Sequence, residues 1–341
     1  MIKYIGSKRR LVPLILDVVR QRAPRAQSAI DMFSGSARVG YAFKGAGLRV
    51  HANDHNAYAH TLARCYVEAD ASLLPEVERV LAELRQVSPH AGWFTKTFCE
   101  DARFFHPKNG ALVDAMRARI AELALAPLLE SAVLVSLMEA ADRVDSTVGV
   151  HMAYLKSWAP RALHDLQLRA PELLPRAAHG AGTAHRLDAA EAAREIVADV
   201  AYLDPPYNQH NYLRNYHIWE SLVLWDKPEV FGVANKRVDC KERPSAFNLK
   251  RQALAALRDV VEHVQAKLLV VSFNDEGFFE RATLEALLEE RGPVTVIEVP
   301  TRRYVGARIG IYNPSGEKVG RVSHVKNKEL LYVVDAAAGS R

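Results

Sequence analysis

The stretch from Ile30 to Asp54 constrains the fold most, because it has the pattern of a strand, a glycine loop, a helix and a second strand. The apolar run AIDMF (Ala29 to Phe33) leads directly into SGSARVG, and YAFKGAG then has helical character and ends in glycines. The second predicted strand is LRVHAND, Leu48 to Asp54. Such a unit is one half of a parallel β-α-β arrangement, so it predicts an α/β fold.

Further strand patterns return only late in the chain, and a long helical segment separates them from the first two. The later predicted strands are Thr183 to Leu187, Asp199 to Leu203, Leu268 to Asn274, Thr295 to Pro300 and Glu329 to Val334. Between them and Asp54, helical patterns such as LLPEVERVLAELRQV and LLESAVLVSLMEAADRV dominate. We therefore expect one mainly parallel sheet domain, residues 1–56 and 182–341, with helices on both faces. Residues 57–181 form a mainly helical insertion between its second and third strands.

The N-terminus and the cysteines narrow the class of protein. No apolar run reaches the roughly 18 residues of a membrane span. MIKYIGSKRR lacks the apolar segment of a secretory signal, and Ser7 is expected to cap the helix LVPLILDVV. Cys65, Cys99 and Cys240 lie far apart, which disfavours a zinc site or a disulfide framework and fits a reducing cytoplasm. The net charge of +5 is compatible with a polyanionic partner, or with a merely basic protein.

Three features at strand ends suggest a ligand site. Asp204 to Tyr207, DPPY, follows a predicted strand, and its prolines can neither continue a helix nor donate a backbone hydrogen bond. An acid there faces the carboxyl edge of the sheet, where α/β folds bind ligands. The glycine loop matches neither GxGxxG nor GxxxxGK[ST], and tight packing explains it about as well as a ligand does. Asp54 can accept hydrogen bonds from ribose hydroxyls or cap the next helix. Together, these features favour a nucleoside-bearing cofactor.

The order of these motifs resembles a known family. The carriers are Tyr4-Ile5-Gly6-Ser7-Lys8, Phe33-Ser34-Gly35-Ser36, Asp54 and Asp204-Pro205-Pro206-Tyr207. They look like the Dam-like, alpha-group DNA adenine methyltransferases, which use S-adenosyl-L-methionine. The blocks YNQHNYLRNYHIWE, ADRVDSTVG and SFNDEG resemble the branch found in restriction–modification systems. The resemblance implies a Rossmann-like class I methyltransferase sheet with a target-recognition insertion.

The resemblance also implies a role for each matching residue. Asp204, Pro205, Pro206, Tyr207 and Lys8 would form the catalytic set. Tyr4, Lys8, Asp31, Phe33, Ser34, Gly35, Ser36, Asp54, Asp188 and Asp204 would bind the cofactor, with Asp54 at the ribose and Asp188 at its adenine. Asp188 can equally be the N-cap of the helix AAEAAREIV. No metal is required.

The residue types suit this reaction. The lone pair of the 6-amino group of adenine is delocalised into the ring, so the nitrogen is a poor nucleophile. The Asp204 carboxylate and the Pro205 carbonyl can each accept one N–H, which draws the nitrogen towards tetrahedral geometry. The lone pair can then attack the sulfonium methyl in a direct in-line displacement, where positioning and electrostatics supply the rate. Tyr207 would stack on an adenine flipped out of the duplex.

The residues that read the DNA are less clearly marked. Candidates in the insertion are Arg143, Ser146, Thr147, Lys156 and Arg161, and a second candidate is the segment Asn208 to Tyr216. His217 and Glu220 share a helix face, and a structural hydrogen bond is their expected role. Near the C-terminus, a turn at Asn313 to Gly316 is flanked by the basic residues Arg302, Arg303, Arg308, Lys318, Arg321, Lys326 and Lys328. This hairpin could contact phosphates, or its charges could be solvated edges.

Other functions fit the motifs less well. An RNA methyltransferase acting on exocyclic amines is the nearest alternative, and the N-terminal YxGxK with the long insertion favours DNA. A nicotinamide oxidoreductase would need GxGxxG, and a silent DNA-binding module has no reason to keep DPPY intact. A cytosine-ring enzyme needs a Pro-Cys nucleophile, and no cysteine follows a proline. We expect a cytoplasmic, bacterial or phage-encoded monomer that acts on double-stranded DNA, beside a separate restriction endonuclease where one exists.

Overall fold

A seven-stranded sheet organises the chain. The computed structural model describes residues 1–302 except 276, and residues 311–312, 318–320 and 326–336. The sheet order is β3-β2-β1-β4-β7-β11-β8. Its strands are β1 (Ser28–Asp31), β2 (Arg49–Asn53), β3 (Thr183–His185), β4 (Val200–Leu203), β7 (Leu268–Asn274), β8 (Val294–Arg302) and β11 (Lys326–Asp335). The five neighbouring strands β3, β2, β1, β4 and β7 pair in parallel, whereas β11 is antiparallel to both of its neighbours, β7 and β8. The predicted α/β fold with a mainly parallel sheet is confirmed.

The remaining elements surround this sheet. The α-helices are α1 (Val12–Arg22), α2 (Arg38–Gly45), α3 (Ala57–Ala63), α4 (Leu74–Leu84), α5 (Trp93–Thr95), α6 (Pro107–Glu122), α7 (Pro127–Arg143), α8 (Ala189–Glu195), α9 (Tyr212–Asn215), α10 (His217–Leu224), α11 (Lys250–His263) and α12 (Arg281–Glu289). Two small antiparallel pairs are β5 (Val230–Phe231) with β6 (Lys236–Arg237), and β9 (Ile311–Tyr312) with β10 (Lys318–Gly320). Within the described residues, no helix combines the length and the apolar character needed to cross a membrane.

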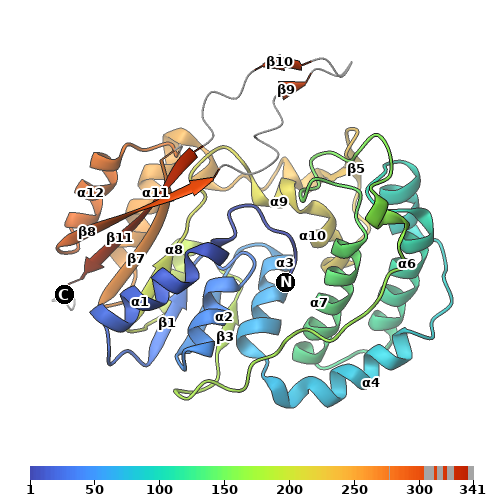
Figure 1. Cartoon of the computed structure of the whole chain (residues 1–341), viewed down its shortest axis with the longest axis horizontal. Coiled ribbons are helices and arrows are strands. Elements are labelled where there is room, and N and C mark those ends of the chain that lie inside the picture. Colours follow the sequence, from blue (N-terminus) through green and yellow to red (C-terminus); the bar gives the residue numbers. More distant parts are fainter. Residues whose placement is uncertain (276, 303–310, 313–317, 321–325, 337–341) are drawn as a thin grey trace.

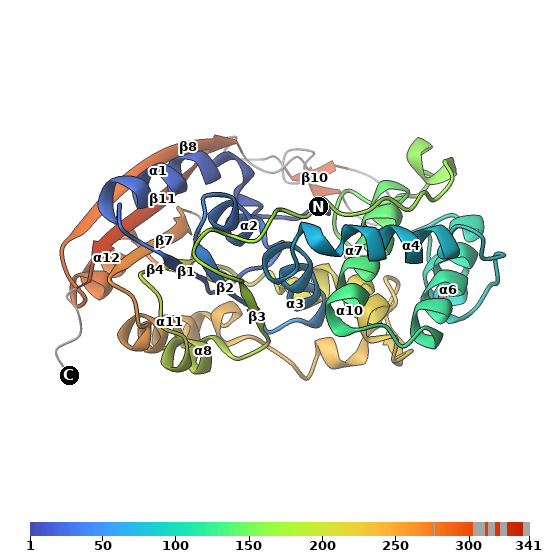
Figure 2. The same cartoon turned by 90° about the horizontal axis from the view of Figure 1, so that it is seen from below.

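Both faces of the sheet are buried, because successive residues of a strand point to opposite sides. Ala29 and Val200 belong to the core shared with α1 and α2, whereas Ile30 and Ala201 belong to the core shared with α8, α11 and α12. Figure 2 shows these two helix layers on either side of the strands. The predicted placement of helices on both faces is therefore confirmed, and the strands read as apolar runs for the same reason.

The helical segment between β2 and β3 packs beside the sheet and shares the core of its first face. Helices α3 to α7 and the π-helical turn Arg64–Glu68 contribute to the same continuous apolar cluster as α1 and α2. In Figure 1 the helices α4, α6, α7 and α10 form one half of the molecule, and β7, β8 and β11 with α12 form the other. The segment lies in the chain where the sequence predicts an insertion.

Of two local predictions, the Ser7 cap is wrong and the C-terminal turn is not tested. Ser7 does not cap a helix through its side chain: it precedes the 3₁₀ turn Lys8–Arg10, and its Oγ accepts a hydrogen bond from Nε of Arg38 at 3.0 Å. The helix α1 begins later, at Val12, with a proline in its first turn as helices tolerate. The predicted C-terminal turn, Asn313 to Gly316, and Arg303, Arg308 and Arg321 lie outside the described residues.

One glycine lets the chain return from the helical segment to the sheet. A Cβ atom on Gly182, just before β3, would lie 2.7 Å from the carbonyl oxygen of Val67 and 2.9 Å from that of Val50. Both atoms belong to the backbone, so neither can rotate away. We expect Gly182→Ala to lower the free energy of unfolding by about 1–3 kcal/mol, measured by urea denaturation.

The matched control is Gly45→Ala, since the nearest atom to a Cβ there is a leucine methyl at 3.4 Å. That change should leave stability unchanged or raise it by up to about 1 kcal/mol. Equal stabilities of the two variants would show that the close approach at Gly182 is not needed.

Candidate active site

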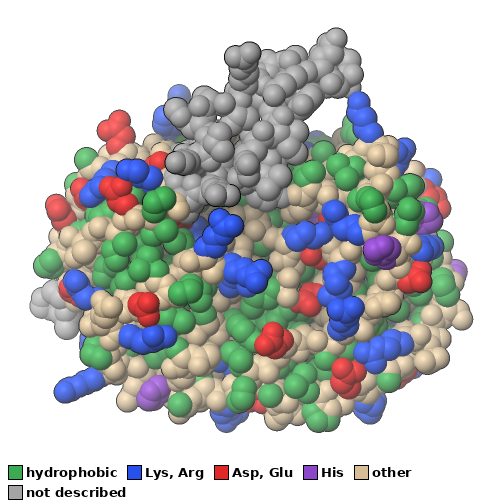
Figure 3. Space-filling view, viewed as in Figure 1, with side chains coloured by type: hydrophobic (Ala, Val, Ile, Leu, Met, Phe, Trp, Pro, Cys, Tyr) green, Lys and Arg blue, Asp and Glu red, His purple; other side chains and the backbone are tan. Residues whose placement is uncertain are grey.

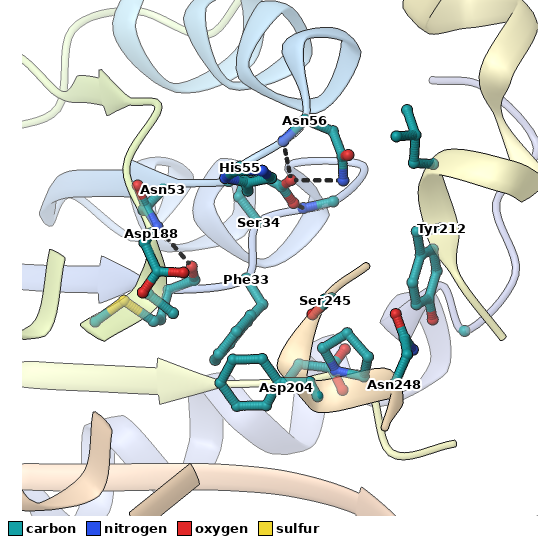
Figure 4. A pocket seen from close by; sticks show the side chains of 18 of the residues that line it. Phe33, Ser34, Asn53, His55, Asn56, Asp188, Asp204, Tyr212, Ser245 and Asn248 are labelled. Carbon is teal, nitrogen blue, oxygen red and sulfur yellow. Dashed lines mark hydrogen bonds between the residues drawn. The ribbon is translucent and has the colours of Figure 1, made fainter. Parts of the chain in front are cut away.

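The carboxyl ends of β1, β2 and β4 open into a cavity of about 530 Å³, within the range of small-molecule sites. Its lining contains the predicted residues Tyr4, Lys8, Asp31, Phe33, Ser34, Gly35, Ser36, Asp54, Asp188, Asp204 and Pro206. Figure 4 shows Asp188 and Asn53 on one side of the cavity, Tyr212 on the other, and Phe33 and Asp204 between them. The structure thus brings together side chains that are about 200 positions apart in the sequence, such as Tyr4 and Pro206, roughly the span of a whole domain.

The glycine loop is shaped by unusual backbone angles and two carboxylates. Gly35 has φ +51°, and Ala37, although not glycine, has φ +60°, a left-handed conformation that costs energy for any residue with a Cβ. Oδ2 of Asp31 accepts from the backbone N–H of Gly40 at 2.8 Å, and Oδ2 of Asp54 accepts from that of Gly35 at 2.9 Å. The two acids therefore hold the loop open at the start of α2.

Asp54 both supports the loop and lines the cavity. Its Oδ1 accepts from the backbone N–H of Asn56 at 2.9 Å, and Asn56, not Asp54, occupies the N-cap position of α3. Burial raises the pKa of Asp54, against the hydrogen bonds from Asn56 and Gly35, which lower it. Burial likewise raises the pKa of Asp31 to about 7. These carboxyls lie in a low-dielectric site where polar contacts are strong.

An apolar slot closes one end of the cavity. The rings of Phe33 and Phe247 meet edge to face, with centroids 5.0 Å apart, and Leu187 lies on the same lining. Asp188 stands beside this slot. Its Oδ1 accepts from the backbone N–H of Ala190 at 2.9 Å, so its role as the N-cap of α8 is real, and its place on the lining is compatible with a second contact.

Lys8 and Asp204 form the charged end of the cavity. Nζ of Lys8 lies 3.0 Å from Oδ1 of Asp204 and 2.7 Å from Oε1 of Glu329, and Lys8 is only 8% exposed. Burial alone would lower the pKa of Lys8, but the two carboxylates together raise it well above its usual value. Burial raises the pKa of Asp204 to about 6; Lys8 opposes this shift and Glu329 adds to it. At neutral pH the site holds an ammonium between two carboxylates.

The other residues of the DPPY motif differ in their place. Pro206 lines the cavity, whereas Pro205, which is buried, and Tyr207 are not among the lining residues. The ring of Tyr207 packs against Phe273, with centroids 5.7 Å apart, and Nζ of Lys8 lies 5.9 Å from its centroid. Its backbone carbonyl accepts from the N–H of Phe278 at 2.9 Å, which fixes the segment after the prolines.

Tyr4 lies in a column of parallel rings. Its ring is 4.7 Å from that of Tyr216 and 5.4 Å from that of Tyr212, with interplanar angles of 8° and 15°. Its hydroxyl is 3.1 Å from the hydroxyl of Tyr58 on α3, and the hydroxyl of Tyr216 accepts from the N–H of Ile5 at 2.6 Å. The N-terminal segment is therefore clamped to the chain that follows DPPY.

Several residues of the site are missed by sequence reasoning. Glu329 is one of them, and it is buried. The sequence does mark it, because it is a charged residue directly before the apolar strand pattern LLYVV. The segment from Pro244 to Asn248 lines the cavity but has no motif. Nδ2 of Asn248 donates to the carbonyls of Asn208 at 2.8 Å and of His210 at 3.1 Å, which attaches this segment to the chain after DPPY.

Two of the candidate DNA-reading residues are buried instead. Ser146 and Thr147 are 0% and 2% exposed. Oγ of Ser146 accepts from the N–H of Ala159, and the hydroxyl of Thr147 donates to Asp145. The buried carboxylate of Asp145 explains the place of Thr147, because a buried charge needs donors around it. Neither side chain is at the surface of this structure, where a base would meet it.

The other candidates differ in whether their side chains are already hydrogen-bonded within the protein. Nε of Arg161 donates to Asp145 at 2.7 Å, and Nη2 of Arg143 donates to the carbonyl of Gln167 at 3.0 Å, so both arginines contribute to the structure of the helical segment. Lys156 is exposed.

The buried pair on α10 has the structural role predicted for it, although the two side chains bond to other groups. Glu220 accepts from the N–H of Tyr58 at 3.0 Å, and Nε2 of His217 lies 3.0 Å from the carbonyl oxygen of His151. Both side chains are fully buried.

Comparisons with known proteins agree with this geometry. Residues 4–276 match the family described as D12 class N6 adenine-specific DNA methyltransferase. The type II methyltransferase M.NlaIII of Neisseria lactamica is 27% identical over 336 residues, which cover 95% of this chain and 99% of that protein. The modification methylase StsI of Streptococcus sanguinis is 27% identical and M.FokI of Planomicrobium okeanokoites 28% identical, each over 89% of this chain. The chain spans about half the length of these two relatives, 48% and 49%.

The ion pairs of Lys8 generate a stability prediction. Lys8→Met leaves two carboxylates close together without their cation, so the free energy of unfolding at pH 8 should fall by about 3 kcal/mol. Repulsion raises the folded-state pKa of these carboxyls above the unfolded value, so the loss grows as the pH rises and shrinks at pH 5. Urea unfolding at both pH values measures it.

The double variant Lys8→Met with Glu329→Gln is the control for this prediction. It removes the repulsion and should regain part of the stability at pH 8. A loss that is the same at pH 5 and pH 8 would contradict the electrostatic explanation.

Proposed function

Since this chain belongs to the D12 class of N6 adenine-specific DNA methyltransferases, we propose that it transfers a methyl group from S-adenosyl-L-methionine to the 6-amino group of an adenine flipped out of double-stranded DNA. Its α/β sheet with helices on both faces is consistent with a class I methyltransferase. The observation that carries the proposal is one cavity that joins Asp54 and Asp188 to Asp204 of DPPY. A nucleoside-bearing donor and a base can meet there.

The lining residues fit S-adenosyl-L-methionine, which when bound supplies an electrophilic methyl group on a sulfonium. The slot of Phe33, Phe247 and Leu187 suits a purine ring, and Asp188 beside it can accept from an exocyclic amine. Asp54 lies where a strand-end acid can hold ribose hydroxyls. Asp31, with Ser34, Gly35 and Ser36 of the loop, would hold the methionine part, and Tyr4 would close that side.

The DPPY motif would activate the substrate. Asp204 and the Pro205 carbonyl each accept one N–H of the adenine amino group, so its lone pair is freed to form the new N–C bond as the methyl leaves sulfur. The prolines stiffen this backbone, and Pro206 adds to the wall. Tyr207 offers its ring to the flipped base, and Lys8 holds Asp204 in place. One amino proton leaves after transfer, which the Asp204 carboxylate can accept.

The division of labour along the chain is also a proposal. Residues 1–56 and 182–341 would carry catalysis, and the helical insertion 57–181 would read the DNA site together with the segment Asn208 to Tyr216. Figure 3 shows Lys and Arg side chains spread over the whole visible face, including the helical half, with Asp and Glu side chains between them. Such a surface attracts the phosphate backbone.

The names of the relatives suggest a biological setting. StsI is named a modification methylase and M.NlaIII a type II methyltransferase, so we propose that this chain protects DNA in a restriction–modification system. It would work in the cytoplasm as a monomer, with any cognate endonuclease acting separately.

The test of the function is transfer of labelled methyl groups to genomic DNA and, in parallel, to total RNA. Label should appear in 6-methyladenine of DNA.

Asp204→Ala and Asp204→Asn should lower kcat by about 10²- to 10⁴-fold, because the acceptor carboxylate is lost. Both variants should bind S-adenosyl-L-methionine within a few-fold of the wild-type affinity, measured by calorimetry. Wild-type kcat/KM should decline below pH 6 or so, as Asp204 becomes protonated. Label in RNA alone would move the assignment to an RNA enzyme, and near-normal activity of Asp204→Ala would refute the role of Asp204.

A second prediction concerns the exposed loop of the insertion. Lys156→Ala should weaken binding to every DNA sequence by a similar factor and reduce the slope of log affinity against log salt by about one, since one phosphate contact is lost. Binding of the methyl donor should not change. Lys241→Ala is a charge-matched control outside the insertion, whose ammonium lies 3.9 Å from the centroid of Phe231. An equal loss in both variants would argue against a specific role of the insertion loop.

A further inference from the structure

Glu329 is a buried acid that the reaction as described does not use. It lies near the start of β11, in the interior of the sheet between β7 and β8, and is 6% exposed. Oε1 lies 2.7 Å from Nζ of Lys8 and accepts from Oγ of Ser272 at 2.8 Å. Oε2 accepts from Nδ2 of Asn274 at 3.2 Å. Both oxygens are therefore engaged, with two donors from β7 fixing the carboxylate in one orientation.

The fold does not require a charge at this position. Burying a carboxylate is costly, and a buried ion pair is often no more stable than an apolar replacement of similar volume. The residues that follow Glu329 in β11, Leu330 to Val334, are apolar and buried. Glu329 is thus a charged residue at the start of the buried part of its strand, and it lies beside the Lys8 ammonium.

The contacts of the Lys8 ammonium indicate a role for the Glu329 carboxylate. Its Nζ contacts Oδ1 of Asp204, so Oδ2 is the oxygen left to accept from a substrate amino group. The lysine stem is flexible, and one carboxylate alone would let the ammonium slide between the two oxygens of Asp204. Glu329 approaches from another strand and gives the ammonium a second fixed partner.

We propose that Glu329 is a positioning residue for the methyl transfer: by anchoring the Lys8 ammonium on Oδ1 of Asp204, it keeps Oδ2 free and oriented for the adenine amino group. The inference rests on the proposed function, since it concerns the same reaction. Ser272 and Asn274 orient Glu329 through their hydrogen bonds, as residues around other functional sites orient the groups that contact the substrate.

The charged groups around Asp204 determine how the pKa values of Asp204 and Lys8 should change when Glu329 is substituted. Lys8 faces Asp204 from the N-terminal segment, Glu329 from β11 and Asp31 from β1, with the hydroxyls of Tyr202 and Tyr212 nearby. Glu329 raises the pKa of Asp204 and helps to raise that of Lys8. Removing its charge should lower both pKa values, because both contributions are Coulombic, and a change in kcat then reports the positioning role itself.

The activity test uses Glu329→Gln, which keeps the shape and removes the charge. We expect kcat to fall on the order of 10- to 100-fold because the acceptor oxygen is no longer held in place. The acid limb of the kcat/KM profile should move to lower pH, and KM for the methyl donor should stay within a few-fold. Glu298→Gln on β8 is the control, since this acid is 40% exposed and pairs with Arg281 and Lys328. The control should behave as wild type.

A second readout does not need activity. In protein labelled with ¹³C-lysine and free of cofactor, the Lys8 signal, assigned with Lys8→Arg, should titrate at a clearly higher pH than the exposed lysines of the wild type, because the two carboxylates raise the pKa of Lys8. In Glu329→Gln the pKa of Lys8 should fall, while other lysine signals stay unchanged. Ser272→Ala, which removes one donor to Glu329, should show a smaller loss of kcat with little change in Tm, and it serves as the test if Glu329→Gln does not fold.

The outcomes separate the two proposals. A wild-type protein that makes no 6-methyladenine would refute the proposed function, whatever Glu329 does. An active wild type together with a Glu329→Gln variant of unchanged kcat, unchanged acid limb and unchanged Lys8 signal would overturn the positioning role. A fall in Tm with no shift of either pKa would also overturn it, because Glu329 would then be structural only.

Discussion

The arrangement of the site depends on the ion pairs that the Lys8 ammonium forms with two carboxylates. The ammonium joins the N-terminal segment to the end of β4 through Asp204 and to β11 through Glu329. These three parts of the chain share no local sequence relationship, and each would carry an uncompensated buried charge without the others. The carboxyl edge of the sheet therefore acquires its final geometry only when the first residues of the chain are in place.

The same N-terminal segment is also attached to the helical half of the molecule. The backbone N–H of Lys3 donates to Asp142 at the end of α7, and its ammonium lies 2.7 Å from Asp145. Tyr4 continues the attachment through its stacking with Tyr212 and Tyr216. The short stretch from Lys3 to Lys8 thus contacts both the helical segment, through Asp142 and Asp145, and the carboxylate of Asp204.

Sequence reasoning locates those parts of the site that obey local rules. Asp31, Asp54 and Asp204 each follow an apolar run, and parallel strands place their carboxyl ends at one edge, so their meeting is predictable. Glu329 is not predictable in this way, because its closeness to Lys8 depends on β11 pairing beside β7, a choice made by tertiary packing. Ser146 and Thr147 are predicted as DNA-reading candidates, but both are buried: Thr147 donates to the buried carboxylate of Asp145, and Ser146 accepts from the backbone N–H of Ala159. Pro244 to Asn248 belongs to no periodic element and gives no signal.

The paired carboxylates around Lys8 have a consequence for the lifetime of the enzyme. A primary amine that keeps its lone pair is a much better acceptor of a methyl group than the amino nitrogen of adenine. Because Asp204 and Glu329 raise the pKa of Lys8 well above its usual value, the nitrogen holds its proton and has no lone pair to offer. With the methyl donor bound as proposed above, Lys8 would lie near an alkylating reagent in its protonated, non-nucleophilic form, so the protein would not compete with its own substrate.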